Sequence, residues 1–500
     1  MSDAVRKIEE WFKGFRFERA FAVLASVTLA ACAHNATSGT TTQPISYSAI
    51  VDAYFRGNDG DSIGGVPAFH TLGASLSAVA PIKGSKVIFI RNGRYHEKLT
   101  VTVPGVTLLG EDRDSVFITF DAASDTPNPA GGTYGMRASW TLRIAAPDFR
   151  AENLTIENAF DYNANAAKDS SDPTKFRNPQ GVALMTDVGS DRATFINVRF
   201  LGHQDTLFAN VGRHYFYHCE IQGNVDFIFG AGRAVFEECE IVSLDRHSKT
   251  NNGYITAADT PDSARFGFLI LRSRLQKESP AMAPSSVTLG RPWHPFADPH
   301  SYPSVVYMDT WMDDHIGTKG WDRMSSVDST GTRIWYEPES ARFAEFGSIG
   351  PGARGGAMRR QLTGAEAAAW TPLNVLEGWI PPRTTTQIKN RPGAGEPEEQ
   401  HAFGRTLEEM FAGKYPGLEV LRLPGGGITF RIRGPNSIFG PSEPLIIVDG
   451  VELQAGGGGL QFLSPEDIEK IEVIKDPGLT AIYGSKGGNG VIVITRKKAR

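Results

Sequence analysis

The sequence predicts an all-β fold, a solenoid of parallel strands called a parallel β-helix, followed by a small α+β domain. Short apolar segments rich in β-forming residues recur along the chain at steps of about 20 to 22 residues. No helical periodicity separates these segments, which is typical of a parallel-strand solenoid. After residue 380 the composition changes, and a different pattern of strands begins.

The repeat is clearest where segments align by their alternating apolar positions. In this alignment Asn197, Cys219 and Cys239 share one column, and Asn153 extends the column upstream. The aligned segments and the candidates for further coils are 151–156, 194–200, 216–221, 235–241, 269–275 and 305–311. Successive coils lie one inter-strand spacing apart, roughly 4.8 Å. Residues one step apart that point the same way are therefore expected to be neighbours.

Cys219 and Cys239 are neighbours by this argument. Stacked Cβ atoms at about 4.8 Å lie slightly beyond normal disulfide spacing. We expect two buried thiols, with a disulfide as the alternative.

The N-terminus has the features of an export signal. A basic stretch precedes an apolar run from Ala20 to Ala31, which is too short to span a bilayer. The run ends in Leu29-Ala30-Ala31-Cys32, which resembles a bacterial lipobox. Residues 1–32 are therefore expected to be a lipoprotein signal, with Cys32 as the lipidated residue; an ordinary signal peptide is the alternative. Ala33 favours outer-membrane attachment, because it is not the aspartate associated with inner-membrane retention.

The composition is that of a folded soluble protein larger than one ordinary domain. The chain has 500 residues, of which 40% are hydrophobic and 21% are charged. The net charge of -5 gives no indication of nucleic-acid binding. It is compatible with an anionic substrate, which local basic residues would have to bind.

The elements are expected in a defined order. A polar tether at 33–44 precedes the solenoid at 45–380. A short helix is predicted at 68–80, and the polar stretch 161–178 predicts a loop. The first solenoid strands are expected at 86–90 and 106–109.

A linker and a second domain complete the expected organisation. Residues 381–402 are rich in Pro, Thr, Gly and Glu without apolar periodicity, which predicts a linker. In the domain expected at 403–500, Ser464 has the character of a helix N-cap. Strands are predicted at 443–450, 471–474 and 491–495.

Two aspartates, Asp205 and Asp226, are 21 residues apart and are therefore expected to stack on adjacent coils. Two carboxylates in contact do not both ionise readily, so one tends to hold a proton while the other stays charged. This division favours a general acid and a nucleophile. Each aspartate alone would more often be a turn or surface residue.

Three further residues extend the candidate site. Arg291, in Leu289-Gly290-Arg291-Pro292-Trp293, offers a guanidinium that can hold one aspartate ionised and oriented. Gln180 and Gln204 are 24 residues apart and can donate hydrogen bonds to an oxyanion. Alone, such an arginine usually packs and such glutamines often form ladders. Together the five residues predict acyl transfer without serine or histidine.

These motifs, with Gly93-Arg94-Tyr95-His96-Glu97, resemble those of the pectin methylesterases over residues 45–380. The resemblance implies a right-handed parallel β-helix and a pectinesterase that hydrolyses the C6 methyl esters of homogalacturonan to pectate and methanol. It implies Asp226 as the nucleophile of an aspartyl acyl-enzyme, oriented by Arg291, and Asp205 as proton donor and acceptor. It implies Gln180 and Gln204 as the oxyanion hole, and no metal or cofactor.

The resemblance also implies substrate contacts. Trp293, Phe229 and Phe208 are expected to stack on sugar rings, and Thr133 is a candidate for the family's substrate-binding threonine. Phe208 stands where a tyrosine is common, and Thr133 is not clearly aligned. These departures concern substrate preference more than chemistry.

The segment 403–500 resembles the plug domain of TonB-dependent outer-membrane receptors, in stretches such as Pro444 to Gly450 and Asp467 to Lys475. An outer-membrane receptor or barrel is therefore a candidate partner, beside pectin and the membrane itself. The alternative is a fused remnant domain.

The expected protein is an exported outer-membrane lipoprotein, facing the periplasm or the surface, that demethylates pectin. One rival is an esterase or thioesterase of the same fold acting on another ester. A second rival is a non-catalytic glycan-binding lipoprotein, which would not need a strained carboxylate pair.

Overall fold

The computed structural model describes residues 46–381, 383, 418–422, 428–432, 444–448, 451–453, 468–474, 480 and 490–496. The chain divides into two compact units, Met1–Pro392 and Gly393–Arg500. The expected export signal with Cys32, the tether, and all of the expected linker except residues 381 and 383 lie outside the described residues.

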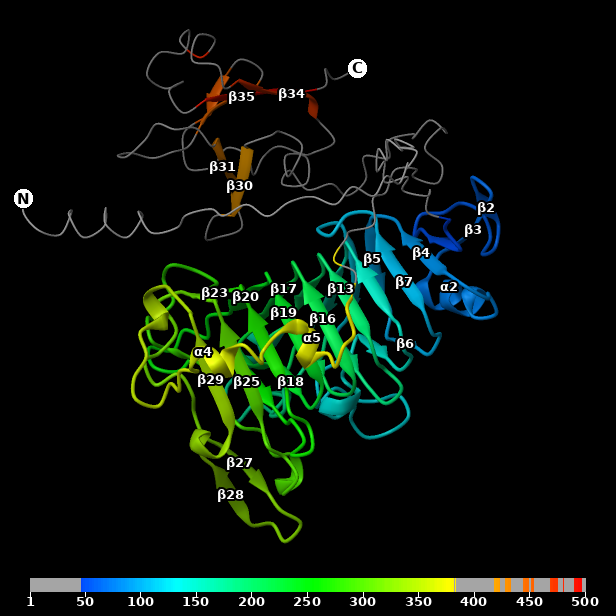
Figure 1. Ribbon diagram of the computed structural model, residues 1–500. Helices are drawn as coiled ribbons and strands as arrows, with labels where there is room; N and C mark the ends of the chain where they lie inside the picture. The colour runs from blue at the N-terminus through cyan, green and yellow to red at the C-terminus, as the bar shows by residue number, and fades with distance from the viewer. Residues whose placement is uncertain are drawn as a thin grey trace, which may run out of the picture. The chain divides into compact units, whose positions relative to one another are not determined.

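The first unit is a parallel β-helix, as the repeat predicted (Figure 1). Three long sheets run along it, and every pairing between consecutive coils is parallel, as in β13 with β16 and β16 with β19. The largest sheet has the order β2(Ser62–Ile63), β3(Val66–Phe69), β1(Ala49–Val51), β4(Lys86–Ile90), β7(Val106–Gly110), β10(Arg150–Glu152), β13(Ala193–Ile196), β16(Arg213–Tyr217), β19(Arg233–Glu237), β22(Phe268–Leu271), β25(Ser304–Met308), β29(Arg342–Phe346).

The other two sheets complete the coils. One has the order β26(Trp311–Met312), β23(Arg274–Lys277), β20(Glu240–Ser243), β17(Glu220–Gly223), β14(Arg199–Leu201), β11(Thr155–Asn158), β8(Val116–Phe120), β5(Gly93–His96). The other has the order β24(Val287–Gly290), β21(Gly253–Ala258), β18(Val225–Gly230), β15(Leu207–Ala209), β12(Leu184–Thr186), β9(Leu142–Ile144), β6(Leu99–Val101). The candidate site residues lie along this last sheet.

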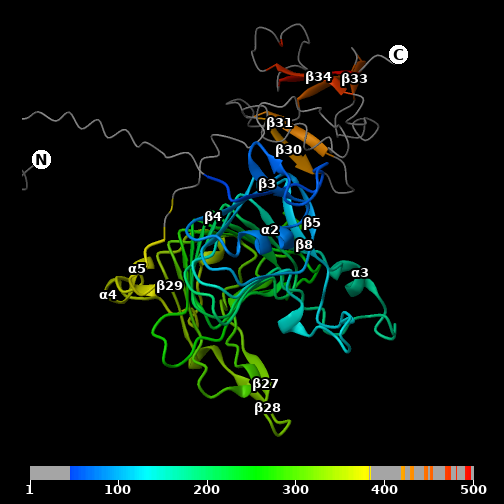
Figure 2. The same cartoon turned by 90° about the vertical axis from the view of Figure 1, so that its right-hand side faces the viewer.

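Short helices and a hairpin decorate the solenoid (Figure 2). α3 and its loop project from one side, and the antiparallel hairpin of β27 with β28 projects from another. The bounds are α2(Leu72–Val79), α3(Tyr162–Ala167), α4(Gly364–Ala367), α5(Pro372–Val375), β27(Met324–Val327) and β28(Arg333–Tyr336), with 3-10 turns η1(Met136–Ala138), η2(Pro295–Ala297), η3(Pro338–Ser340) and η4(Pro351–Ala353). None of the helices within the described ranges has the length and apolar character needed to cross a bilayer.

α2 confirms the short helix predicted at 68–80, and its ends follow from local capping. The Thr71 hydroxyl accepts a hydrogen bond from the Ala74 N–H at 3.2 Å. The Glu97 carboxylate accepts from the Leu72 and Gly73 N–H groups at 2.8 and 3.0 Å, where the helix dipole favours negative charge. Glu97 of the 93–97 motif therefore stabilises the end of the solenoid.

The core runs along the inside of the coils. Stacked aromatic rings fill part of it, and Phe216 has ring centroids 4.8 Å from Phe195 and 4.6 Å from Phe236. A separate apolar cluster forms outside the largest sheet. In it, Val375 at the end of α5 and the following Leu376 pack with Tyr215 and Val235. The segment that contains α5 therefore covers part of the outer face of this sheet.

The predicted alignment of Asn197 with Cys219 was wrong by one residue. Asn153 and Asn197 do stack, and the Asn197 amide donates to Asn153 Oδ1 at 2.8 Å. The register pairs Ile196 with Tyr217, however, which places His218 rather than Cys219 level with Asn197. The residues at this turn share positive φ values: 53° at Asn153, 52° at Asn197, 51° at His218 and 54° at Glu238. Cys219 and Cys239 are buried free thiols, as expected.

The second unit contains a hairpin and a four-stranded mixed sheet. In that sheet β32 pairs parallel with β35 and antiparallel with β33, while β34 pairs antiparallel with β35. These strands confirm those predicted near 443–450, 471–474 and 491–495; the helix start at Ser464 lies outside the described residues. The bounds are β30(Leu418–Arg422), β31(Ile428–Ile432), β32(Leu445–Val448), β33(Val451–Leu453), β34(Ile468–Ile474) and β35(Val491–Arg496).

Candidate active site

Asp205 and Asp226 lie on adjacent coils of the seven-stranded sheet. β15 and β18 pair Leu207 with Ile228, which preserves the offset of 21 residues between the aspartates, and the Asp205 N–H donates to the Val225 carbonyl at 3.1 Å. Both aspartates have left-handed backbones, with φ of 64° and 51°. Such conformations are uncommon for residues other than glycine, although aspartate, asparagine and histidine adopt them more often than most, and they cluster at functional sites.

Arg291 forms a two-point ion pair with Asp226. Nε lies 2.8 Å from Asp226 Oδ1, and Nη2 lies 2.5 Å from Oδ2. The backbone holds Arg291 in place, because its N–H donates to the Thr256 carbonyl at 3.0 Å. Its guanidinium also lies 4.0 Å from the ring centroid of Tyr254. The fork geometry orients both oxygens of Asp226.

The two carboxyl groups differ in their electrostatic surroundings. Only 8% of Asp205 and 5% of Asp226 are exposed. Burial, and then the charge of Asp226, raise the pKa of Asp205 well above its usual range, against the opposing effects of Arg291 and Gln204. Burial alone would lower the pKa of Arg291, but Asp226 raises it overall. Asp205 therefore keeps its proton to a higher pH than an ordinary aspartic acid does.

Gln180 and Gln204 lie on adjacent coils beside the pair. The Gly181 N–H donates to the Gln204 carbonyl at 3.0 Å, which brings the two segments together. Gln180 Oε1 is buried and has no hydrogen-bond partner among the described residues. Rotation of this side-chain amide by 180° would place its N–H donors at this position, free to bond to an oxyanion.

The aromatic residues expected at the site form one cluster. Phe208 and Phe229 stack with centroids 4.2 Å apart, and Trp293 meets them edge-on at 6.1 and 5.6 Å. Phe208 is fully buried and Phe229 is 2% exposed, whereas Trp293 is half-buried. The two phenylalanines therefore support Trp293 from beneath, and no open ring face of either is available for stacking.

The loop before β9 supplies residues that the sequence did not single out. Met136 and Trp140 pack against the aromatic cluster, whereas Thr133 is exposed and bridges to Pro127 within the loop. Met136 and Trp140 could not be found from the repeat spacing, because they lie on an irregular excursion between coils.

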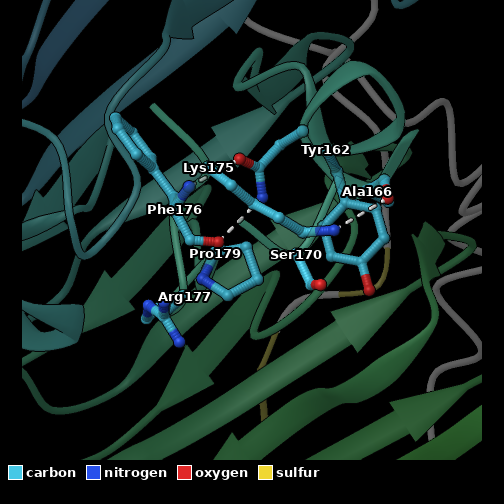
Figure 3. A pocket seen from close by; sticks show the side chains of 8 residues that line it. Tyr162, Ala166, Ser170, Lys175, Phe176, Arg177 and Pro179 are labelled. Carbon is cyan, nitrogen blue, oxygen red and sulfur yellow. Dashed lines mark hydrogen bonds between the residues drawn. The ribbon is translucent and has the colours of Figure 1, made fainter. Parts of the chain in front are cut away.

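The polar stretch 161–178, predicted as a loop, contains the short helix α3 and directly precedes Gln180 in the sequence. Residues of this loop and Pro179 line a cavity of about 380 Å³ (Figure 3). Lys175 crosses the loop and donates to the carbonyls of Lys168 and Ala166 at 2.6 and 3.2 Å. Tyr162 lines the cavity and stacks on His203, next to Gln204, at 4.8 Å. The loop is thereby tied to the coil that holds Asp205.

Within the described ranges, no three His, Cys, Asp or Glu side chains are grouped so that they could hold a metal ion. The chemistry available from the described residues is that of a paired carboxyl and carboxylate, a guanidinium and two amides. Such a set suits acyl transfer, in which one group attacks a carbonyl and another moves the proton.

Comparisons with known proteins agree with this chemistry. Residues 62–376 match the family described as Pectinesterase, and residues 395–491 match the TonB-dependent Receptor Plug Domain. Pectinesterase A of Dickeya chrysanthemi is 40% identical over 367 residues, which cover 71% of this chain and 96% of the relative. Probable pectinesterase 8 of Arabidopsis thaliana is 31% identical over 293 residues, which cover 57% of this chain and 65% of that relative.

Solved structures show the same similarity. The pectin methylesterase from Erwinia chrysanthemi superimposes with a TM-score of 0.64 at 40% identity and covers 68% of this chain and 99% of its own. The pectin methylesterase from Yersinia enterocolitica gives a TM-score of 0.60 at 42% identity and covers 62% and 99%. The match extends over more than half of the chain and includes the sheet that holds Asp205, Asp226 and Arg291. The chain belongs to the pectinesterase family of carboxylic ester hydrolases.

Proposed function

We propose that this protein hydrolyses the methyl esters of pectin through an acyl-enzyme on Asp226. The observation that carries the proposal is the two-point ion pair between Arg291 and Asp226 beside a carboxyl whose pKa is raised. Arg291 orients both oxygens of Asp226, while the raised pKa of Asp205 lets that carboxyl retain a proton. A nucleophile and an acid are thus present in adjacent coils.

In the first step an oxygen of Asp226 attacks the ester carbonyl carbon of a galacturonate unit. The amides of Gln180 and Gln204 stabilise the oxyanion by donating hydrogen bonds. The bond to the methoxy oxygen then breaks, and Asp205 gives that oxygen its proton, so methanol leaves. An anhydride between Asp226 and the sugar carboxyl remains.

In the second step Asp205, now ionised, takes a proton from water as the water oxygen attacks the galacturonoyl carbonyl. The bond to Asp226 breaks and restores its carboxylate, which Arg291 stabilises as a leaving group. The product is a free galacturonic acid unit, and Asp205 is protonated again.

Trp293 is the proposed sugar-stacking residue, because it is the half-buried member of the aromatic cluster. Phe208 and Phe229 would act through it by fixing its position. Thr133 remains a candidate for contact with a more distant part of the polymer, since it is exposed on the loop.

Methanol release from methylated pectin tests the function, and trapping tests the mechanism. Wild-type enzyme should release methanol, and added hydroxylamine should convert part of the product to galacturonohydroxamate by capturing the acyl-enzyme. Asp226→Ala should abolish both signals. Methanol release without any hydroxamate would contradict the acyl-enzyme, and release of thiol from acyl thioesters in place of methanol from pectin would favour the rival thioesterase.

We further propose that the protein is exported and anchored in the outer membrane through Cys32, and that the plug-like domain docks on an outer-membrane receptor or barrel. The lipobox-like sequence at 29–32 and the match of 395–491 to a receptor plug support this. Cys32→Ala should move the enzyme from the membrane fraction to the soluble fraction. Deletion of 403–500 should leave it in the membrane but remove its co-purification with the receptor.

A further inference from the structure

Lys98 lies in the short connection between β5 and β6, the strands at one edge of their sheets. Its half-buried side chain donates hydrogen bonds from Nζ to the carbonyls of Ala138 and Trp140 at 2.6 and 2.5 Å. These carbonyls are 40 and 42 residues further along the chain, in the loop between β8 and β9. No step of the proposed mechanism uses this lysine.

Three aromatic rings lie around the same amine. Nζ is 3.4 Å from the ring centroid of Trp140, 4.9 Å from that of Tyr134 and 5.6 Å from that of Phe120. All three rings are within the distance of about 6 Å at which a ring face attracts a cation. Among the described residues, no carboxylate lies within ion-pair distance of Lys98. Ring faces and carbonyl oxygens are therefore the groups that hold this cation.

The enclosure of Lys98 has opposing effects on its charge. Burial disfavours an ammonium group and lowers the pKa of Lys98 to about 7. Ring faces and carbonyl oxygens favour the charged form, because both attract a cation. In mildly acidic solution the amine is protonated and has donors for both carbonyls.

The part of the loop that Lys98 binds reaches the active site. Met136 and Trp140 pack against the aromatic cluster, in which Trp293 lies edge-on to two stacked phenylalanines. Trp140 thus contacts Lys98 through its ring and its carbonyl oxygen and also contacts the cluster that supports Trp293. Lys98 is connected to the proposed sugar-stacking residue through this one tryptophan.

The start of the same loop contacts the oxyanion hole without Lys98. The Ser124 N–H donates to the Gln180 carbonyl at 2.8 Å. The Lys98 contacts lie at the other end of the loop, which spans residues 121–141. Movement of that end is therefore expected to affect the binding of sugar rings more than the chemical steps.

We propose that Lys98 is a positioning residue, which holds the end of the loop 121–141 against the aromatic cluster and so fixes Trp293 for stacking on a sugar ring. The proposal rests on the proposed role of Trp293 in the pectinesterase. A neutral apolar side chain in place of Lys98 would leave the Ala138 and Trp140 carbonyls without their donor and let the loop end move. The enzyme would then bind methylated pectin more weakly and convert bound substrate at nearly the same rate.

Steady-state kinetics of methanol release at about pH 6, where the amine is protonated, test the proposal. Lys98→Met keeps the length of the side chain but loses its charge and its donors. Its KM on methylated pectin should rise by about three- to tenfold, the size of one lost aromatic contact, while kcat stays within about twofold of wild type.

Lys86→Met is the matched control. Lys86 on β4 also donates from Nζ to two carbonyls, those of Gly84 and Pro104 at 3.4 and 3.1 Å. These contacts involve the largest sheet and its turns, and no residue of the loop 121–141. Lys86→Met should therefore keep the wild-type KM.

A double-mutant cycle separates positioning from a general structural role. Trp293→Ala removes the ring that Lys98 is proposed to fix, so adding Lys98→Met to it should change KM by less than about twofold. If Lys98 only contributed to stability, Lys98→Met would lower the melting temperature and leave KM unchanged.

A wild-type KM in Lys98→Met, or a rise in KM that is equally large in the Trp293→Ala background, would overturn the proposal. If Lys98→Met does not fold, Lys98→Gln gives the same comparisons with a polar side chain that has no charge. Failure of the proposed function looks different, because the wild-type enzyme would then release no methanol, or Trp293→Ala would keep the wild-type KM.

Discussion

At the scale of single residues, a conservative substitution of Arg291 should break its two-point ion pair with Asp226. Arg291→Lys keeps the charge but loses one of the two parallel hydrogen bonds to Asp226. We expect kcat for methanol release to fall by about 10²–10³-fold, comparable to the loss of one preorganised donor, with a smaller change in KM. Arg274→Lys, at an exposed arginine over Trp311 away from the site, is the control and should keep wild-type kcat.

The raised pKa of Asp205 also predicts a pH-dependent stability. Burial, and then Asp226, hold its folded pKa above the unfolded value of about 3.9. Its contribution to stability is therefore complete below that value and is lost as pH rises toward the folded pKa. Asp205→Asn has no proton to lose, so its melting temperature should rise relative to wild type between pH 4 and 7.

Calorimetry of both proteins across this range measures the difference. Asp328→Asn, measured also below pH 4, is a control of opposite sign: hydrogen bonds, first from the Thr330 side chain, lower the pKa of the half-buried Asp328, so its contribution to stability is lost as pH falls. A difference between Asp205→Asn and wild type that stays constant with pH would contradict the raised pKa.

Contacts between site residues that lie one coil apart could be predicted from the repeat period. Contacts made by residues on irregular loops between the coils could not. Asp205 and Asp226 lie on successive strands of one sheet, so the repeat period was enough to place them side by side. Met136 and Trp140 pack against the aromatic cluster from the loop before β9. That loop has no periodic pattern, so the repeat spacing did not indicate these contacts.

At the scale of elements, the turn after each strand of the largest sheet explains the one-residue error in the predicted column. The alignment matched apolar positions, and it treated Asn197, Cys219 and Cys239 as equivalent. The backbone instead repeats a left-handed residue, which is Asn197, then His218, then Glu238. Since few residues other than glycine adopt this conformation, and glutamate is not among those enriched in it, the sequence alone did not indicate that His218 and Glu238 occupy it.

The contact between β21 and β24 is so close that it requires glycine at position 290. A Cβ on Gly290 would lie 2.1 Å from Thr256 Oγ1 and 2.6 Å from the Thr256 carbonyl oxygen. Gly290→Ala should therefore separate the strands and displace the adjacent Arg291. We expect a loss of about 1–3 kcal/mol in the free energy of unfolding, together with a fall in kcat.

Denaturant unfolding and methanol release measure the two effects of Gly290→Ala. The matched control is Gly364→Ala at the start of α4, where an added Cβ would meet nothing within 4 Å. Wild-type kcat in Gly290→Ala would contradict the idea that the position of Arg291 depends on this strand contact.

At the scale of the whole molecule, the chain combines an esterase with a receptor-type plug. The main core of the β-helix is built from residues between Ala49 and Phe343, and the outer cluster from residues between Tyr215 and Leu376. The described buried residues of the second unit, such as Phe430, Ile446 and Ile492, belong to neither cluster. Each unit therefore has its own apolar residues to bury, as expected of separate domains.

This separation predicts that the esterase is independent of the plug-like domain. A chain ending at Pro392 keeps every described residue of the site and both clusters, so it should release methanol with the kcat and KM of the full chain. The thermal unfolding of this shortened chain should coincide with the main transition of the full protein. The Asp226→Ala variant serves as the inactive reference. Loss of activity on removal of 393–500 would instead mean that the plug-like domain completes or stabilises the site, and a raised KM confined to long pectin chains would assign it a role in holding the polymer.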